Sequence, residues 1–245
     1  MIEKVEQLKK EFLKIKNKGW IKGKGFGYNS IGVTFEQLLG LQQNELEIGD
    51  YEGIEIKTKR YNSRSYITLF SYTPEGKYYH EVERIKDTYG YPHKKYFKYK
   101  VLNNSVYGDK KNKIGLNFYF KLCVDRENNK IYLEIYDKNK NLIEKNVYWD
   151  FDIIKQKLYR KLKVLALIKS YNKVINDKEY FKYNEIKIYE LKSFDVFINL
   201  IEKGFVRINF KLNINTSENK FGKIHDHGTS FDILEEDLEK LYNRI

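Results

Sequence analysis

The stretch Asp50-Tyr51-Glu52-Gly53-Ile54-Glu55-Ile56-Lys57 decides how the chain is organised. Apolar and charged side chains alternate over residues 53–57, which predicts a short strand with its isoleucines on one face and Glu55 and Lys57 on the other. Asp50 lies just before this strand, so two carboxylates and an ammonium are expected to converge at one strand end. Neighbouring carboxylates repel each other unless a cation joins them, and Mg²⁺ prefers oxygen ligands of this kind.

Such an arrangement is suited to the hydrolysis of a phosphodiester bond. A bound Mg²⁺ polarises the phosphate and generates hydroxide, and Lys57 can face a phosphate oxygen or the attacking water. Because 33% of the residues are charged, the same pattern also arises by chance. A solvated edge strand is therefore the alternative interpretation.

The composition indicates a globular protein with an excess of positive charge. The chain has 245 residues, 41% of them hydrophobic, which is enough for one large domain or two lobes sharing a core. Lys and Arg number 46 against 34 Asp and Glu, and the net charge of +12 favours a polyanionic partner, nucleic acid first. A general bias toward lysine-rich sequence is the alternative. The 22 tyrosines supply rings for packing, phosphate contacts or base stacking.

The single cysteine and the absence of long apolar stretches bear on location. Cys123 lies in the apolar run 116–124. Because it is the only cysteine of the sequence, neither an intrachain disulfide nor a Cys-based zinc site is expected. This is in keeping with a reducing cytoplasm. Residues 1–4 show no signal-peptide pattern, and no apolar stretch is long enough to span a bilayer. We therefore expect a cytoplasmic protein without a membrane partner.

The hydrophobic pattern predicts a mixed α+β fold with an antiparallel-rich sheet system. Apolar residues at helical spacing predict an amphipathic helix over 2–17, and Ser30 is expected to cap a helix that ends at Gly40. Strands at 53–58 and 66–70 are expected to form a hairpin at the core of the catalytic sheet. Further helices are predicted at about 79–85, 150–161, 193–203 and 234–242, and further strands at 115–124, 130–136, 142–148, 162–170, 180–191 and 205–212. The three strands within 115–148 indicate an antiparallel meander.

Glu36 lies on the helix predicted after Ser30. If that helix packs beside the strand, Glu36 becomes a third carboxylate that could hold Lys57 or a water. Considered alone, it is typical of a surface helix position.

The glycine-rich segment 19–29 contains Lys22 and Lys24. Glycine lets the backbone approach a ligand closely. We expect this loop to touch a nucleic-acid backbone, with an ordinary flexible turn as the alternative.

A second informative cluster lies at 220–231, where His225-Asp226-His227 follows Lys223. A His-x-His pair can bind a metal from one side of a strand, or it can present donors to base acceptors in the major groove. The lysines before it favour nucleic acid. The alternative is a structural role in which the histidines cap turns and bond to the backbone.

Taken together, these motifs resemble the MvaI/BcnI type II restriction endonucleases, a family related to the mismatch-repair nicking enzyme MutH. The motifs are Gly32-Val33-Thr34-Phe35-Glu36, Asp50 with Ile54-Glu55-Ile56-Lys57, Thr68-Leu69-Phe70, Val147-Tyr148-Trp149 and His225-Asp226-His227-Gly228-Thr229. They run in the family's order over nearly the whole chain, and their combination is specific although each alone is weak. The resemblance implies a monomeric, Mg²⁺-dependent nuclease with a MutH-like mixed sheet flanked by helices, in two lobes around a DNA cleft.

The resemblance also implies roles for the catalytic residues. By position, Asp50 and Glu55 would hold Mg²⁺, Lys57 would position or activate the water, and Glu36 would be the supporting carboxylate. The catalytic lobe would comprise about 1–110 plus part of 115–170.

The recognition lobe would comprise about 171–245, where the His225–His227 loop would read base edges. Family members that cut CC-(A/T)-GG place arginines near this loop, and this chain has Lys211 and Asp232 at those places. Arg is the usual partner of guanine, whereas Asp accepts from cytosine N4. The resemblance therefore leaves the target sequence open.

The expected function is sequence-specific cleavage of double-stranded DNA, with a cognate methyltransferase as a genetic rather than a physical partner. Lys22, Lys24 and Lys223 are expected to contact the DNA backbone. The alternatives are a strand-nicking endonuclease of the MutH type and a nucleic-acid-binding module without catalysis. In each case binding should weaken steeply with salt, because phosphate contacts release counterions.

Overall fold

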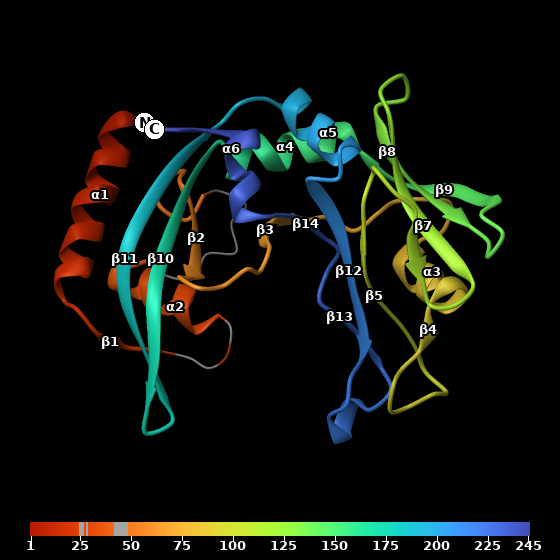
Figure 1. Ribbon diagram of the computed structural model, residues 1–245, viewed down its shortest axis with the longest axis horizontal. Helices are drawn as coiled ribbons and strands as arrows, with labels where there is room; N and C mark the ends of the chain where they lie inside the picture. Colours follow the sequence, from red (N-terminus) through yellow and green to blue (C-terminus); the bar gives the residue numbers. More distant parts are fainter. Residues whose placement is uncertain (25–26, 28, 42–48) are drawn as a thin grey trace. The chain divides into compact units, whose positions relative to one another are not determined.

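The structure, a computed structural model, describes residues 1–24, 27, 29–41 and 49–245. The chain forms two compact units, each assembled from separate stretches of sequence (Figure 1). Unit 1 comprises Met1–Ser65, Lys157–Lys192 and Glu239–Ile245, and unit 2 comprises Tyr66–Gln156 and Ser193–Leu238.

The units divide the chain differently from the lobes expected from the sequence. Residues 66–110, expected in the catalytic lobe, belong to unit 2, and residues 171–192, expected in the recognition lobe, belong to unit 1. The reason is that strands distant in sequence pair with each other, so neighbours along the chain do not share a unit. The assignment of catalysis and recognition to these units stays a prediction.

Unit 1 is built on a five-stranded sheet in the order β1-β11-β10-β2, with β15 also paired with β11. The strands are β1 (Ile21–Lys22), β2 (Glu55–Arg60), β10 (Val164–Ile175), β11 (Lys178–Leu191) and β15 (Tyr242–Arg244). β10 and β11 form a long antiparallel hairpin, whereas β2 joins β10 in parallel. The mixed α+β class predicted from the sequence is therefore confirmed, with a parallel pair at the edge that carries the motif.

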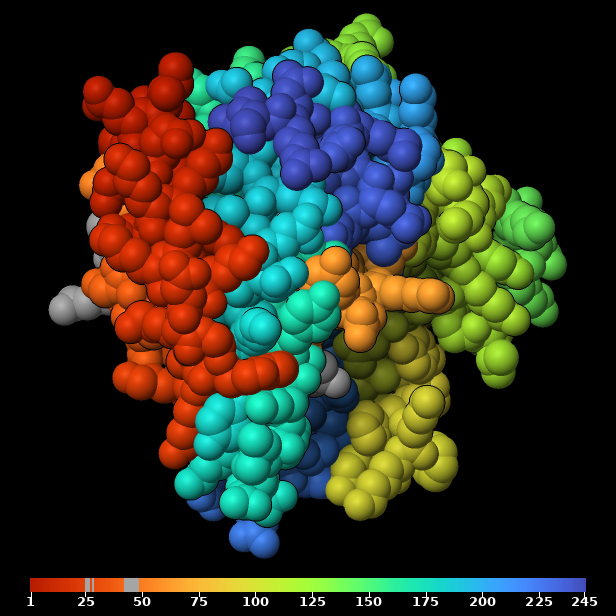
Figure 2. All heavy atoms as spheres, turned by 60° about the vertical axis from the view of Figure 1, so that its left-hand side comes forward, coloured from red at the N-terminus to blue at the C-terminus, as the bar shows by residue number. Residues whose placement is uncertain are grey.

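Two helices cover one face of this sheet. The helix α1 (Ile2–Asn17) buries Val5, Leu8, Phe12 and Ile15, as its spacing predicts. These side chains join Phe35 of α2 (Ser30–Leu38) and the isoleucines of the β2 region in one hydrophobic core. Figure 2 shows α1 (red) lying beside the β10–β11 hairpin (teal and cyan).

Ser30 does not cap α2 as predicted, although the helix itself is confirmed. The N-cap residue is Asn29. The Ser30 hydroxyl instead lies 2.9 Å from both the Gly27 carbonyl oxygen and Glu179 Oε2, the two acceptors within reach of its single proton. The Ser30 hydroxyl therefore binds a partly exposed acceptor on β11 instead of the helix terminus that the local pattern predicted.

The hairpin predicted between 53–58 and 66–70 is wrong. β2 pairs with β10, and β3 (Ile67–Ser71) pairs with β14 (Ser230–Ile233) in unit 2. Residues 164–168 are all buried, which is typical of a strand in the interior of a sheet. Such a strand pairs along both of its edges, and β2 occupies one of the two edges of β10. The link after β2 leads from unit 1 into unit 2 rather than into a tight turn.

Unit 2 contains two sheets. The six-stranded sheet has the order β3-β14-β12-β5-β4, with β13 also paired with β12, and the four-stranded sheet has the order β6-β7-β8-β9. Their further strands are β4 (Tyr91–Pro92), β5 (Lys100–Val106), β12 (Val206–Ile214), β13 (Ile224–Asp226), β6 (Asn112–Ile114), β7 (Phe118–Asp125), β8 (Lys130–Tyr136) and β9 (Leu142–Asp150). The predicted antiparallel meander is confirmed as β7–β9.

Aromatic rings fill the core of unit 2. Phe70 and Phe231 stack with ring centroids 4.6 Å apart, and the buried Trp149 packs edge-on against Phe231. The indole Nε1 of Trp149 donates to the Tyr72 carbonyl oxygen at 2.9 Å, so this ring also has its polar atom satisfied.

The remaining helices follow the predictions with one exception. The helices are α3 (Glu81–Tyr89), α4 (Phe151–Lys161), α5 (Phe194–Glu202) and α6 (Leu238–Leu241), with short 3₁₀ turns at Glu218–Lys220 and Glu235–Asp237. Ser193 caps α5 as predicted, accepting from Val196 N at 3.2 Å. The helix expected over 234–242 is shorter in the structure, where α6 ends at Leu241 because the next residues form β15 and pair with β11. No helix in the described part of the chain is long and apolar enough to cross a membrane.

Candidate active site

The turn before β2 brings Asp50 back over the strand. Gly53 has φ +92°, which favours glycine, and a Cβ on Gly49 would lie 2.7 Å from the Gly53 carbonyl carbon. These two glycines let the chain fold tightly on itself. As a result, Asp50 Oδ2 accepts a hydrogen bond from Ile56 N at 3.0 Å.

Glu55 is buried, with only 1% of its surface exposed. In the parallel register it lies beside Leu165, and Lys57 lies beside Leu167, so the carboxylate has apolar neighbours in place of water. A buried charge needs a counter-charge. Lys57 Nζ lies 2.7 Å from Glu55 Oε1, and Lys161 Nζ lies 3.5 Å from the same oxygen.

The other carboxylate oxygen, Glu55 Oε2, is buried and has no hydrogen-bond partner among the described residues. Burial raises the pKa of Glu55; the ammonium of Lys57 lowers that pKa and the charge of Asp50 raises it further. A buried acceptor left without a donor, close to a second carboxylate, fits a hard divalent cation.

Glu36 joins this cluster from α2. Burial raises the pKa of its carboxyl group, the charge of Asp50 raises it further, and Lys57 opposes the shift. A Cβ on Gly32, one turn before Glu36, would lie 3.3 Å from Thr58 Oγ1, so the helix packs closely on β2. The structure thus brings the four predicted catalytic residues into one electrostatic cluster.

Two neighbours of Glu55 were missed by sequence reasoning. Lys161 is the last residue of α4, and the buried Tyr242 belongs to β15. Burial and the charge of Glu55 raise the pKa of the Tyr242 hydroxyl, which has no hydrogen-bond partner among the described residues. No local signal marks either residue, because the pairing of β2 with β10 and of β15 with β11 brings them there.

The described residues contain no group of three or more His, Cys, Asp or Glu side chains arranged to hold a metal ion. Mg²⁺ commonly keeps several waters and binds through one or two carboxylates together with substrate phosphates.

The His225–His227 loop lies on unit 2 and is exposed. The two imidazole rings are 4.0 Å apart between centroids, and Asp226 Oδ1 accepts from Gly228 N at 2.7 Å. His227 N donates to the Lys211 carbonyl oxygen at 3.2 Å, which ties the loop to β12.

Burial alternates along β12, so that Arg207, Asn209 and Lys211 form a partly exposed polar face. Asp232 is opposite Arg207 in the pairing of β12 with β14, but it is only 2% exposed. Its carboxylate accepts from Thr68 Oγ1 at 2.9 Å and lies 3.4 Å from Arg207 Nη2. A direct contact between Asp232 and a base edge, as predicted, would require these bonds to open.

Comparison with known proteins decides the family. The model of the MvaI/BcnI restriction endonuclease family matches residues 9–242. The chain belongs to the MvaI/BcnI restriction endonuclease family. As a member, it is a type II restriction endonuclease, a site-specific deoxyribonuclease.

Two solved structures show the same relationship. The structure of restriction endonuclease MvaI in complex with its cognate DNA substrate matches with a TM-score of 0.90 and 32% identity, covering 100% of this chain and 98% of that one. The structure of MvaI in the absence of DNA matches with a TM-score of 0.64 and 31% identity, over the same shares of both chains. The restriction-endonuclease-like fold expected from the sequence is thereby confirmed. Comparison with curated proteins gave no match.

The lysines predicted to contact the DNA backbone in this family member are exposed in both units. Lys22 and Lys24 lie in unit 1, where Lys24 N donates to Thr34 Oγ1 at 2.8 Å, and Lys223 lies in unit 2. Residues 25, 26 and 28 of the glycine-rich loop lie outside the described residues.

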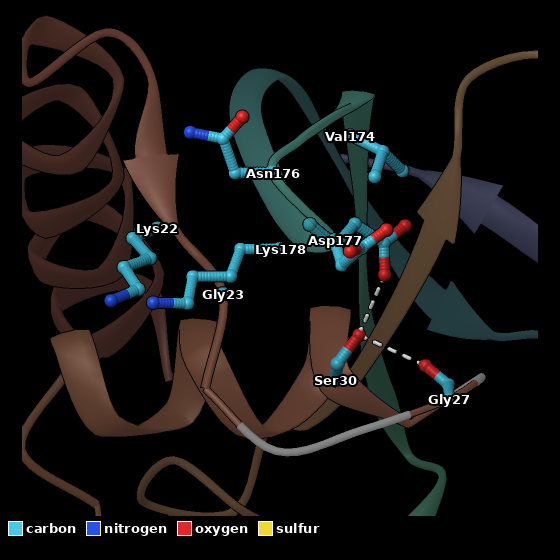
Figure 3. Close-up of a pocket in the computed structure, with 9 residues that line it drawn as sticks. Lys22, Gly23, Gly27, Ser30, Val174, Asn176, Asp177 and Lys178 are labelled. Carbon is cyan, nitrogen blue, oxygen red and sulfur yellow. Dashed lines mark hydrogen bonds between the residues drawn. The ribbon is translucent and has the colours of Figure 1, made fainter.

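Lys22 lines a pocket of about 550 Å³ between β1, the start of α2 and the tip of the β10–β11 hairpin (Figure 3). Lys178 and Glu179 also line it. The Glu179 carboxylate accepts from Ser30 Oγ and, at 2.9 Å, from Arg60 Nε, so its charge is already compensated. Asp177 also lines the pocket, so two lysines and one further carboxylate provide its remaining charges.

Proposed function

We propose that this restriction endonuclease hydrolyses phosphodiester bonds of duplex DNA at the cluster of Glu36, Asp50, Glu55 and Lys57, with Mg²⁺ as its cofactor. The observation that carries the proposal is the buried Glu55 carboxylate: one oxygen is bound to Lys57, and the other has no hydrogen-bond partner among the residues that the structure describes. Membership of the family and the similarity to a complex of MvaI with cognate DNA support double-stranded DNA as the substrate.

Asp50 and Glu55 would hold the Mg²⁺. When bound, this ion stabilises charge on the scissile phosphate and lowers the pKa of a water molecule. Asp50 is fixed for this task because Ile56 N holds one of its oxygens. The apolar neighbours of Glu55 exclude water and so strengthen electrostatic interactions within the site.

Lys57 would place its ammonium beside Glu55, where it can donate a hydrogen bond to the attacking water or to a phosphate oxygen. Glu36 is suited to accept a proton from that water, because its carboxylate lies within electrostatic reach of both Asp50 and Lys57. The new P–O bond would then form as the proton moves to Glu36. The bond from phosphorus to the leaving oxygen, on the opposite side, breaks, and that oxygen takes up a proton from solvent water.

Base reading is proposed for the polar face of β12 together with the loop that follows it. The Lys211 ammonium and the imidazoles of His225 and His227 can donate to guanine acceptors in the major groove. Asp226 has one oxygen occupied by Gly228 N, which leaves the other to accept from cytosine N4. Asp232 would contribute indirectly by holding the guanidinium of its neighbour on β12.

Lys22, Lys24 and Lys223 are proposed to contact DNA phosphates. Their exposure and the net charge of +12 support this role. Contacts of this kind position the protein on DNA without selecting a sequence.

We further propose that the protein acts as a monomer in the cytoplasm, with a cognate methyltransferase as its genetic partner. One chain carries both the carboxylate cluster and the His225–His227 loop, so a single copy contains groups for both tasks. The one free cysteine fits a reducing compartment.

The test compares Glu55→Ala with Glu52→Ala. Glu52 is a matched control because it lies in the same turn but its side chain is 62% exposed. Supercoiled plasmid is digested with Mg²⁺, and DNA binding is measured with Ca²⁺ in place of Mg²⁺. We expect Glu55→Ala to lose cleavage by at least about 10³-fold while binding DNA nearly as well, and Glu52→Ala to behave as wild type.

Undiminished cutting by Glu55→Ala would reject the assignment. The wild-type product also distinguishes the two nuclease activities: linear plasmid indicates double-strand cleavage, whereas open circles that persist with excess enzyme indicate nicking. Sequencing the fragment ends of a digested genome then gives the target site.

A further inference from the structure

Lys161 is a second ammonium at Glu55, and the proposed function gives it no task. It ends α4 and reaches the same carboxylate oxygen that Lys57 contacts. Both side chains are partly exposed, 33% for Lys161 and 26% for Lys57, so neither is locked in the core.

The two lysines hold Glu55 differently. Lys57 Nζ lies at 2.7 Å and donates a hydrogen bond, whereas Lys161 Nζ lies at 3.5 Å and acts through its charge alone. A lysine stem is long and flexible, so the more distant ammonium can move away at little cost. Lys161 is therefore the looser of the two counter-charges.

The charge of the cluster explains why a loose counter-charge is useful. Three carboxylates, from Glu36, Asp50 and Glu55, lie within electrostatic reach of two ammonium groups. Both ammonium groups are needed while no divalent cation is present. Once a divalent cation binds, the positive charge of the cation and the two ammonium groups exceeds the negative charge of the three carboxylates. One ammonium then repels the cation and is no longer needed to neutralise a carboxylate.

We propose that Lys161 is a displaceable counter-ion, which neutralises Glu55 while the divalent cation is absent and yields that position when the cation binds. The released ammonium is then available to a phosphate of the bound DNA. Lys161 is thus a positioning residue of the metal-free site. The inference rests on the proposed function, because it requires the cation to bind at Asp50 and Glu55.

The experiment measures Mn²⁺ binding to the full chain without DNA, by electron paramagnetic resonance of the free ion. Lys161→Met removes the charge, Lys161→Arg keeps it, and Arg160→Met removes an exposed charge from the adjacent position as a matched control. Asp50→Asn removes the charge of a proposed ligand and so tests whether Mn²⁺ binds at this site. Thermal unfolding of each variant is recorded in EDTA and with saturating Mn²⁺.

We expect Lys161→Met to bind Mn²⁺ more tightly, by roughly three- to tenfold, because a competing positive charge is gone. Lys161→Arg and Arg160→Met should bind as wild type does. Lys161→Met should also unfold at a lower temperature than wild type in EDTA. This difference should close with Mn²⁺, because the variant that binds the ion more tightly gains more stability from it.

Equal or weaker Mn²⁺ binding by Lys161→Met would overturn the inference, as would an unfolding difference that persists with Mn²⁺, since that is the behaviour of a purely structural ion pair. Failure of the proposed function gives a different result: Asp50→Asn would then bind Mn²⁺ as well as wild type does, which would remove the site on which this inference rests.

Discussion

Two polar strand faces in this chain differ in how far their charged groups are exposed to solvent. On β2, Glu55 is 1% exposed, lies beside Leu165 and is matched by ammonium groups at Oε1. On β12, Lys211 is partly exposed, and the adjoining His225–His227 loop is open to solvent. The first face concentrates a few charges away from water, whereas the second spreads donors and acceptors along a wet surface.

The difference matches the tasks proposed for the two faces. Chemistry at a phosphate benefits from charges in a poorly hydrated site, where Coulomb interactions are strong and the groups are already in place. Base reading needs groups that can exchange water for the edges of base pairs. Substitutions on β2 should therefore change the rate of cleavage, and substitutions on β12 should change the choice of DNA.

Of the substitutions that separate the two faces, Lys57→Met is expected to have the largest effect. Loss of the ammonium beside Glu55 should lower the single-turnover cleavage rate by about 10²- to 10⁴-fold, the range for a group that handles a proton or charge in the transition state. DNA affinity with Ca²⁺ should stay within about threefold. Lys163→Met is the control, because Lys163 is exposed and directly precedes β10, the strand that pairs with β2. A variant that cut normally but bound DNA poorly would place Lys57 in binding rather than catalysis.

Lys211→Ala and His227→Ala should have a smaller effect of a different kind. Each should weaken binding to the cognate site by about 10- to 100-fold, corresponding to about 1–3 kcal/mol per specific contact, and leave binding to unrelated DNA almost unchanged. Fluorescence anisotropy with both duplexes measures the ratio. An equal loss on both duplexes would mean that β12 contacts the backbone and does not read bases.

Lys24→Ala and Lys223→Ala should weaken binding a few-fold and equally on every sequence. Each phosphate contact removed should reduce the slope of log affinity against log salt by about 0.9. Titrations at several salt concentrations give this slope. An unchanged slope would remove the lysine concerned from the DNA interface.

The smallest effect is expected from Glu36→Gln on the stability of the metal-free protein. Burial raises the pKa of Glu36 above 4.5, so its contribution to stability is complete below pH 4.5 and is lost as pH rises through the raised pKa. The side chain of the glutamine variant does not ionise, so the variant does not lose this stability as pH rises. At pH 7 it should be more stable than wild type by less than about 1 kcal/mol, or about 2 °C in unfolding temperature. Thermal unfolding in EDTA at several pH values tests this, and a gap that shrank with rising pH would contradict it.

The sequence predicted those elements and side-chain orientations that depend on the local pattern of apolar and polar residues. The spacing of Val5, Leu8, Phe12 and Ile15 predicted α1, and alternation predicted that Glu55 lies away from the apolar core face of β2. The pairing of β2 with β10 has no local signal, because its partners come from opposite halves of the chain. The false hairpin follows from that pairing, as does the difference between the two compact units and the lobes expected from the sequence.

Residues that reach a site from distant elements were also beyond prediction. Lys161 and Tyr242 look like ordinary residues near helix ends until the sheet of unit 1 is assembled. The burial of Asp232 depends in the same way on its cross-strand neighbour Arg207 and on Thr68 of β3. Local chemistry identified the candidate side chains, whereas tertiary pairing decided which of them are exposed.

The most direct test of the cation site is a crystal structure of the protein with its own target duplex and Ca²⁺, a divalent cation that also binds carboxylate oxygens. Anomalous scattering locates the ion independently of the protein coordinates. We predict a peak about 2.4 Å from a carboxylate oxygen of Asp50 and from Glu55 Oε2. A peak between His225 and His227, or a phosphate bound at Glu55 with no ion beside it, would contradict the account.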